Sequence, residues 1–295
     1  MSKDYLQRLV FEEISARAVV VHLDEVVDEV VSRDSYPPAV SALLGEALLV
    51  VALLSSGIKF QGRVSLQLQG HSGLKLLIAD CTHDGGLRGI ARVDEEVALP
   101  AGRDELFESL ARGGILTLTL DPSDGGQRWQ GIVPLEGESL ATAVEAYFDR
   151  SEQLTTRVFL GQDSERAGAL MLQQMPGASD DPDGWNRLQQ LAATIKPDEL
   201  LELDGQTLFQ RLFHEEQCRL FEASPLRFDC PCTRERVRNV LVSLGAAELI
   251  ALAEEQEVVE VKCQFCNQAY HFDAVDVAAM GHEGEAADAS DPTIH

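Results

Sequence analysis

The chain of 295 residues carries 49 acidic and 24 basic side chains, which gives a formal net charge of −25. This charge argues against nucleic acid as a partner, because proteins bind phosphate backbones largely through Lys and Arg that displace counterions. Hydrophobic residues make up 45% of the chain, enough for a folded core. At about 100 to 200 residues per domain, the length suggests one large domain and a smaller one.

Neither a secretory signal nor a membrane helix is predicted. Charges interrupt every apolar run in residues 1–17, so the hydrophobic stretch of a signal peptide is missing. The most apolar segment, 39–54, contains Glu46 and is shorter than the roughly 20 residues that span a bilayer. We therefore expect a buried core helix at 39–54, no membrane partner and a cytoplasmic protein.

The apolar residues of segment 1–176 alternate between helical and strand periods, which predicts an α+β domain. Helices are expected at 24–33, 39–54 and 140–148. Strands are expected at 14–23, 64–69, 74–79, 87–93, 115–120, 128–133, 155–160 and 167–175. Because consecutive strands are joined by short turns, the sheet should be mostly antiparallel.

Three further regions follow. Residues 177–227 begin with an acidic turn-rich stretch and predict a helical linker of marginal stability, with helices at 185–193 and 208–214. Residues 228–276 predict a small unit that needs a staple, since so few residues rarely hold a core alone. Its expected elements are helices at 234–244 and 246–255 and a hairpin of strands 258–262 and 269–272. Residues 277–295 contain no Lys or Arg, and we expect an acidic, disordered tail.

Four of the six cysteines form two short pairs, Cys230-Pro-Cys232 and Cys263-Gln-Phe-Cys266. Four thiolates suit tetrahedral zinc with bonds of about 2.3 Å. The intervening segment is longer than in a zinc ribbon, so a structural disulfide and a redox dithiol stay open as alternatives. His271 lies nearby but is at most a spare ligand, because four thiolates complete the shell.

The C-x-C pair also suggests sensitivity to oxidants. A disulfide between cysteines one residue apart closes a small strained ring, which favours a labile bond. Oxidation of a metal-bound thiolate removes the ligand, and loss of the metal would unfold a small unit that depends on it. The zinc staple is therefore a candidate redox switch.

The remaining motifs predict structure rather than catalysis. Cys81 and Cys218, the latter in a helical stretch, are expected to be buried and inert. The segment 147–153, YFDRSEQ, should be a helix end at which Asp149 and Glu152 are solvated. Walker loops, G-x-S-x-G and H-E-x-x-H motifs are missing from the sequence, and we expect no enzyme.

Segments 227–232, RFDCPC, and 263–272, CQFCNQAYHF, resemble the zinc-binding signature of the bacterial redox-regulated heat-shock chaperones, the 33 kDa chaperonin family. Segments with the sequences FQGR, GLRG, YFDRSEQ and GALMLQQMP resemble further blocks of that family, in the same order. They lie at 60–63, 86–89, 147–153 and 168–176. The resemblance therefore covers the chain up to about residue 273.

The resemblance implies an ATP-independent holdase that is inactive while reduced and bound to one zinc ion. By motif position, the metal ligands would be Cys230, Cys232, Cys263 and Cys266. Peroxide or hypochlorite with unfolding stress would form disulfides Cys230–Cys232 and Cys263–Cys266 and release zinc. The linker 177–227 would then lose structure, unfolding client proteins would bind, and the active protein would dimerise.

Two other functions stay open on the residues themselves. The Cys263-Gln-Phe-Cys266 pair could serve a thiol-disulfide oxidoreductase. Alternatively, the zinc-stapled unit could be a constitutive interaction module with no redox response.

Overall fold

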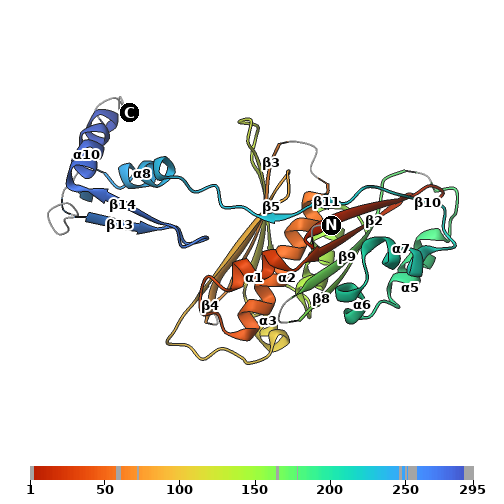
Figure 1. Cartoon of the computed structure of the whole chain (residues 1–295). Helices are drawn as coiled ribbons and strands as arrows, with labels where there is room; N and C mark the ends of the chain where they lie inside the picture. The colour runs from red at the N-terminus through yellow and green to blue at the C-terminus, as the bar shows by residue number, and fades with distance from the viewer. Residues whose placement is uncertain are drawn as a thin grey trace. The chain divides into compact units, whose positions relative to one another are not determined.

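The computed structural model describes residues 3–57, 61–71, 73–163, 166–177, 179–245, 248–249, 251 and 258–288. The chain divides into two compact units, Met1–Asp229 and Cys230–His295. The positions of the two units relative to each other are not determined (Figure 1).

Helix α2 (Pro38–Ser55) is the centre of the first unit. Pro38 stands at its first turn, where the missing N–H would have no partner in a helix. Its side chains are apolar almost all round, so the helix can be stable only when covered on every side. It packs against strands of both sheets of this unit. Among the described residues, α2 meets the length and composition of a membrane span, but 72% of it is buried, as expected of a core helix.

The first sheet has the order β10-β1-β2-β9-β8, with β11 also paired to β1, and all its pairs are antiparallel. Its strands are β1 (Tyr5–Phe11), β2 (Ala16–Leu23), β8 (Thr156–Gln162), β9 (Ala167–Gln174), β10 (Cys218–Leu220) and β11 (Ser224–Pro225). The predicted strands β2, β8 and β9 are confirmed. Strand β1 was not predicted, because its buried residues Leu6, Leu9 and Phe11 do not keep a strict period of two.

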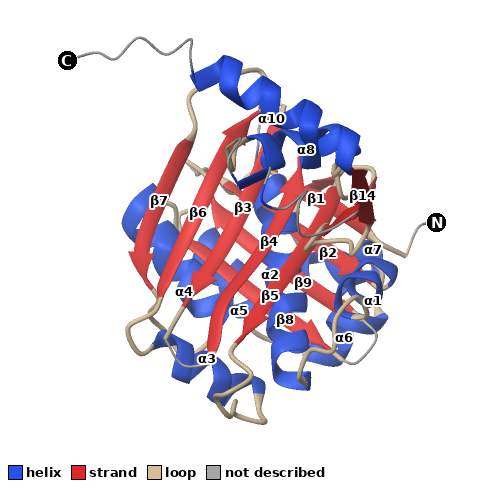
Figure 2. Cartoon of the chain, turned by 90° about the vertical axis from the view of Figure 1, so that its left-hand side faces the viewer, coloured by secondary structure: helices blue, strands red, loops and turns tan. Residues whose placement is uncertain are grey.

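The second sheet has the order β12-β5-β4-β3-β6-β7, and Figure 2 shows β5, β4, β3, β6 and β7 side by side. Its strands are β3 (Gly62–Gln69), β4 (Leu74–Thr82), β5 (Gly86–Val93), β6 (Ile115–Pro122), β7 (Trp129–Pro134) and β12 (Arg227–Phe228). The predicted hairpins are confirmed here. The unpredicted β12 runs parallel to β5, with Phe228 opposite Leu87.

Shorter helices complete this part of the unit. They are α1 (Glu25–Val31), α3 (Arg103–Ala111), α4 (Leu140–Tyr147) and the π-helix η1 (Phe148–Glu152). Helix α4 begins with a capping box in which Ser139 and Thr142 satisfy each other's backbone N–H groups. The helix ends inside YFDRSEQ, as predicted: Asp149 and Glu152 are exposed, and Gln153 has a left-handed φ of 54°.

Residues 184–213 form three helices that cover one face of the first sheet. These are α5 (Gly184–Ala192), α6 (Pro197–Glu202) and α7 (Gly205–Phe213). Their buried side chains, including Leu188 and Phe213, share a core with Leu9 and Phe11 of β1. Gly168 permits this packing, since a Cβ there would lie 2.1 Å from the Leu200 carbonyl oxygen. The predicted linker helices therefore exist, and they belong to the first unit.

The second unit contains α8 (Arg234–Val242), the hairpin β13 (Val258–Lys262) and β14 (Ala269–Asp273), and α10 (Ala274–Asp288). Its apolar core is small, with six buried residues among those described: Leu241, Leu249, Val259, Phe272, Val277 and Met280. The predicted hairpin and first helix are confirmed, whereas most of the predicted helix 246–255 lies outside the described residues.

Two boundaries differ from prediction. The unit begins at Cys230 rather than at residue 228, because Phe228 pairs with β5 in the first unit. The tail predicted to be disordered from residue 277 instead continues α10 to Asp288. Burial of Val277 and Met280 anchors this helix despite its acidic composition, and residues 289–295 lie outside the described part.

Candidate metal centre

Two separate segments supply the four paired cysteines. Cys230 and Cys232 lie in the extended chain just before α8, whose first turn is capped by the Thr233 hydroxyl. Cys263 and Cys266 lie in the turn between β13 and β14. That turn is closed by the bond from the Cys263 N–H to the Gln268 carbonyl, at 3.0 Å, and by Asn267 with its φ of 57°. Each segment therefore presents its two thiols from one short stretch of backbone.

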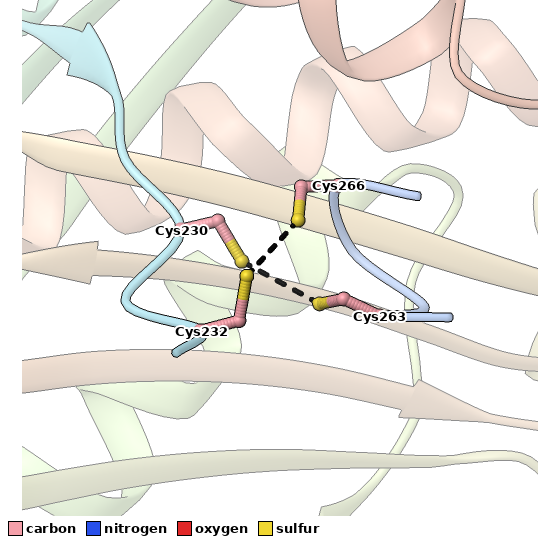
Figure 3. A group of neighbouring side chains, drawn as sticks. All are labelled: Cys230, Cys232, Cys263 and Cys266. Carbon is pink, nitrogen blue, oxygen red and sulfur yellow. Dashed lines mark hydrogen bonds between the residues drawn. The ribbon is translucent and has the colours of Figure 1, made fainter. Parts of the chain in front are cut away.

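The four sulfurs point toward one another (Figure 3) and all lie within 4.8 Å of each other. Across the two segments, the Sγ atoms of Cys230 and Cys263 are 3.7 Å apart, and those of Cys232 and Cys266 are 3.2 Å apart. Tetrahedral zinc with thiolate bonds would space its sulfurs by about 3.8 Å. The donor set and its spacing fit a four-thiolate zinc site, and all four residues are free thiols.

The thiols do not share one electrostatic environment. Burial raises the pKa of Cys230. Burial also acts to raise the pKa of Cys263, but the backbone N–H groups of Cys266 and Phe265 outweigh it, and that pKa is lowered. All four side chains are half-buried, so a small oxidant can reach them.

Side chains around the cysteines hold the two segments in place. The Tyr270 hydroxyl donates to the Cys232 sulfur at 3.2 Å, and Arg236 donates to the Pro231 carbonyl at 2.7 Å. Arg234 pairs with Asp276 and lies 4.3 Å over the Phe272 ring. Sequence reasoning did not single out these contacts. The predicted hairpin placed Tyr270 on the strand after Cys266, but its contact with Cys232 depends on the fold.

The remaining predicted positions lie outside this cluster. His271 is exposed, with Nδ1 3.5 Å from Glu260, and it is not among the grouped ligand atoms. Cys81 is fully buried, and burial raises its pKa to about 12, as expected for an inert thiol. The prediction for Cys218 is wrong, because this residue is exposed and lies in β10 rather than a helix. Strand β10 is a sheet edge of three residues with β1 on one side only, which leaves the thiol uncovered.

Comparison with known proteins agrees with this architecture. The family model described as Hsp33 protein matches residues 4–273. The 33 kDa chaperonin of Methylobacillus flagellatus is 41% identical over 280 residues, which are 94% of each chain. The 33 kDa chaperonin of Pseudomonas paraeruginosa is 44% identical over 295 residues, covering 96% of this chain and 98% of that protein.

A crystal structure of the 33 kDa chaperonin from Thermotoga maritima has the same fold. The TM-score is 0.82 at 22% identity, and the match covers 96% of this chain and 99% of that one. The α+β fold with a four-cysteine C-terminal unit is thus confirmed. From the match over nearly its whole length, the chain belongs to the Hsp33 family of 33 kDa chaperonins and is a heat-shock chaperone.

Proposed function

We propose that this chaperone is a redox-controlled, ATP-independent holdase of the cytoplasm that prevents unfolding proteins from aggregating. In the reduced state, Cys230, Cys232, Cys263 and Cys266 would hold one zinc ion, and the protein would be inactive. The proposal rests on one observation, the convergence of four thiols within 4.8 Å in a unit that has a small apolar core. Zinc bound there would keep the sulfurs as thiolates and add free energy to folding.

The distribution of the cysteines favours oxidation within each pair as the switch. A disulfide Cys230–Cys232 or Cys263–Cys266 stays inside one segment, so it removes ligands without joining the two segments. A bond from Cys230 to Cys263 would instead keep the segments joined. Each disulfide forms when two thiolates give two electrons to the oxidant, which reduces peroxide to water or hypochlorite to chloride and water. The oxidised unit then has neither the metal nor a covalent crosslink between its segments.

The linker 177–227 supplies the client surface in this proposal. Helices α5 to α7 cover an apolar sheet face that includes Leu9, Phe11 and Leu170. When these helices lose structure, both the sheet face and their own apolar side chains become available to an unfolding protein. Such exposed surface also favours association of two active copies, so we propose a homodimer on activation.

Aggregation of a chemically denatured client, followed by light scattering, tests the proposal. Peroxide-treated protein should suppress aggregation, whereas reduced zinc-loaded protein should not. One zinc ion should be released as four thiols disappear. Equal suppression in both states, or none in either, rejects the switch.

The same samples separate the two alternatives. Catalytic turnover in insulin reduction by a protein that binds no zinc when reduced would favour a thiol-disulfide oxidoreductase. Unchanged zinc content and helical circular dichroism after oxidation would favour a constitutive zinc-stapled module.

A further inference from the structure

A cavity of about 370 Å³ lies within the first unit, far along the chain from the cysteine pairs. Both sheets line it, together with the C-terminal end of α2 and the helices α4 and η1. Most of the lining is apolar, including Leu54, Val64, Leu118 and Met171, with Trp129 and Phe148 as aromatic walls. The volume lies in the range of small-molecule sites, which combine apolar walls with a few polar groups.

Arg17 brings a positive charge to this apolar cavity. Its Nε and Nη2 atoms donate to the Gln173 side-chain oxygen at 3.1 and 2.8 Å. The Gln173 amide is fixed in turn, because its nitrogen donates to the Thr156 hydroxyl at 3.1 Å. The buried amide therefore holds the guanidinium in one position and leaves other N–H groups available for a ligand.

Arg17 has no carboxylate partner in the part of the chain that the structure describes. Among the described residues, neither Asp nor Glu forms an ion pair with it, and the charged neighbour that affects it is Arg8, of the same sign. Burial, and then Arg8, lower the pKa of Arg17. Gly57, just after α2, lies close enough that a Cβ there would be 3.2 Å from Nη2. The C-terminal end of α2 supplies only partial negative charge, so among the residues that the structure describes this half-buried cation has no full counter-ion.

The acidic residue of the cavity lies at its solvent side. Glu152, at the end of η1, is exposed and accepts a bond from the Tyr147 hydroxyl at 3.3 Å. Its charge is therefore screened by water more strongly than that of Arg17. Trp129 stands at the rim with 41% of its surface exposed, next to Tyr147 at 6.5 Å between ring centroids. Phe148 and Glu152, which also line the cavity, belong to the π-helix η1, an element often found at functional sites.

We propose that this cavity is a binding site for a small organic monocarboxylate with an apolar body. The carboxylate would accept charge-assisted hydrogen bonds from Arg17, which is suited to planar, two-point recognition of carboxylates. The body would lie against the aliphatic lining and the Trp129 and Phe148 rings. The site is independent of the redox switch, since none of its lining residues belongs to the second unit.

Tryptophan fluorescence of the full-length reduced, zinc-loaded protein measures this binding. Trp129 and Trp185 are the two tryptophans of the chain, and the Trp185→Phe variant leaves only the one at the cavity. Octanoate, octanol and octylamine share one chain length and differ in charge. Octanoate should bind at least about tenfold more tightly than octanol, and octylamine should bind more weakly than either.

Two substitutions with opposite expected effects on octanoate affinity make the test specific. Arg17→Met should weaken octanoate binding about tenfold with little effect on octanol, while Glu152→Gln should strengthen octanoate binding a few fold. Arg128→Gln is the matched control, since Arg128 is exposed beside Trp129 and does not line the cavity. If Arg17→Met does not fold, Arg17→Lys, which keeps the charge, should retain the preference for octanoate over octanol.

Three results would overturn the proposal. Equal affinity for octanoate and octanol would mean that the cavity recognises only apolar chains. Tightest binding of octylamine would assign recognition to Glu152. Loss of octanoate binding in Arg128→Gln equal to that in Arg17→Met would indicate general surface electrostatics.

Discussion

The two units reach stability by different routes. The first buries α2 between two six-stranded sheets and adds a second core under helices α5 to α7. The second has a small core of six buried residues among those described, and its four paired cysteines lie close together on two separate segments. Apolar burial responds weakly to oxidants, whereas a thiol cluster responds directly. In the proposed switch, the redox signal therefore enters at the second unit, while the core around α2 stays folded.

The largest expected effect is on the second unit alone. Under the proposed function, removing zinc with a chelator, or replacing the proposed ligand Cys232 in Cys232→Ser, should unfold this unit, since structural zinc supplies on the order of 10 kcal/mol in comparable small sites. Amide hydrogen exchange should show lost protection in β13 and β14 and unchanged protection in α2. Retained protection of the hairpin without zinc would show that its apolar core suffices.

A core substitution in the linker should show whether chaperone activation follows from loss of this contact or from loss of stability in general. Phe213→Ala removes a fully buried ring that meets Phe11 edge-on at 5.2 Å, and should cost about 3 to 5 kcal/mol. Because the loss falls on the face between α7 and β1, the reduced variant should already suppress client aggregation. Leu48→Ala in α2 is the control, with a loss of about 3 kcal/mol in urea unfolding and no activation. Equal activation by both variants would mean that general instability is the cause.

Acid pH should weaken the contact between β1 and α7 at a second position, where Tyr5 meets Gly205. Burial lowers the pKa of His22 to about 4, and its ring stacks on Tyr5, whose hydroxyl accepts from the Gly205 N–H of α7. The unfolded chain takes up this proton near pH 6.5, so stability is full above that pH and falls toward pH 4. The loss should reach about 3 kcal/mol.

A paired comparison isolates the histidine. Glu46 acts in the opposite direction, because burial raises its pKa to about 7, and stability is lost as the pH rises from 4.5 through 7. The His22→Phe variant keeps the stacked ring and also keeps Glu46. When its free energy of unfolding in urea is subtracted from that of the parent protein, the Glu46 contribution therefore cancels. The difference between the two proteins should change between pH 6.5 and 4 and stay constant above 7. A difference independent of pH would contradict a buried neutral imidazole.

Local periodicity predicted the elements whose apolar pattern lies within one continuous segment of the chain. The α2 helix and the β3–β4 and β13–β14 hairpins follow from apolar spacing and short turns. Features that depend on distant partners were missed or misjudged, such as β12 pairing with β5 across more than 130 residues. The acidic α10 likewise depends on Val277 and Met280 meeting a core that composition does not reveal.

The candidate site divides in the same way. The spacing of the cysteines already identified all four grouped thiols, since each pair lies on one short segment. The contact of Tyr270 with Cys232 and the cavity at Arg17 join segments far apart in sequence, so no local pattern carries them. Exposure of Cys218 depends on how many strands flank β10, which is a property of the sheet.

The smallest expected effect is that of Cys218→Ser, and it tests whether the thiols divide as the two units do. Cys218 is exposed, although burial and then the nearby Glu12 and Glu216 raise its pKa, so it should react slowly with oxidants. The substitution should lower the thiol count of the native protein by one in a colorimetric titration. Zinc release and client protection after peroxide should stay within about twofold of the parent protein, because Cys218 belongs to the first unit and the four grouped thiols belong to the second. A larger change would place a fifth cysteine, in the first unit, within the switch.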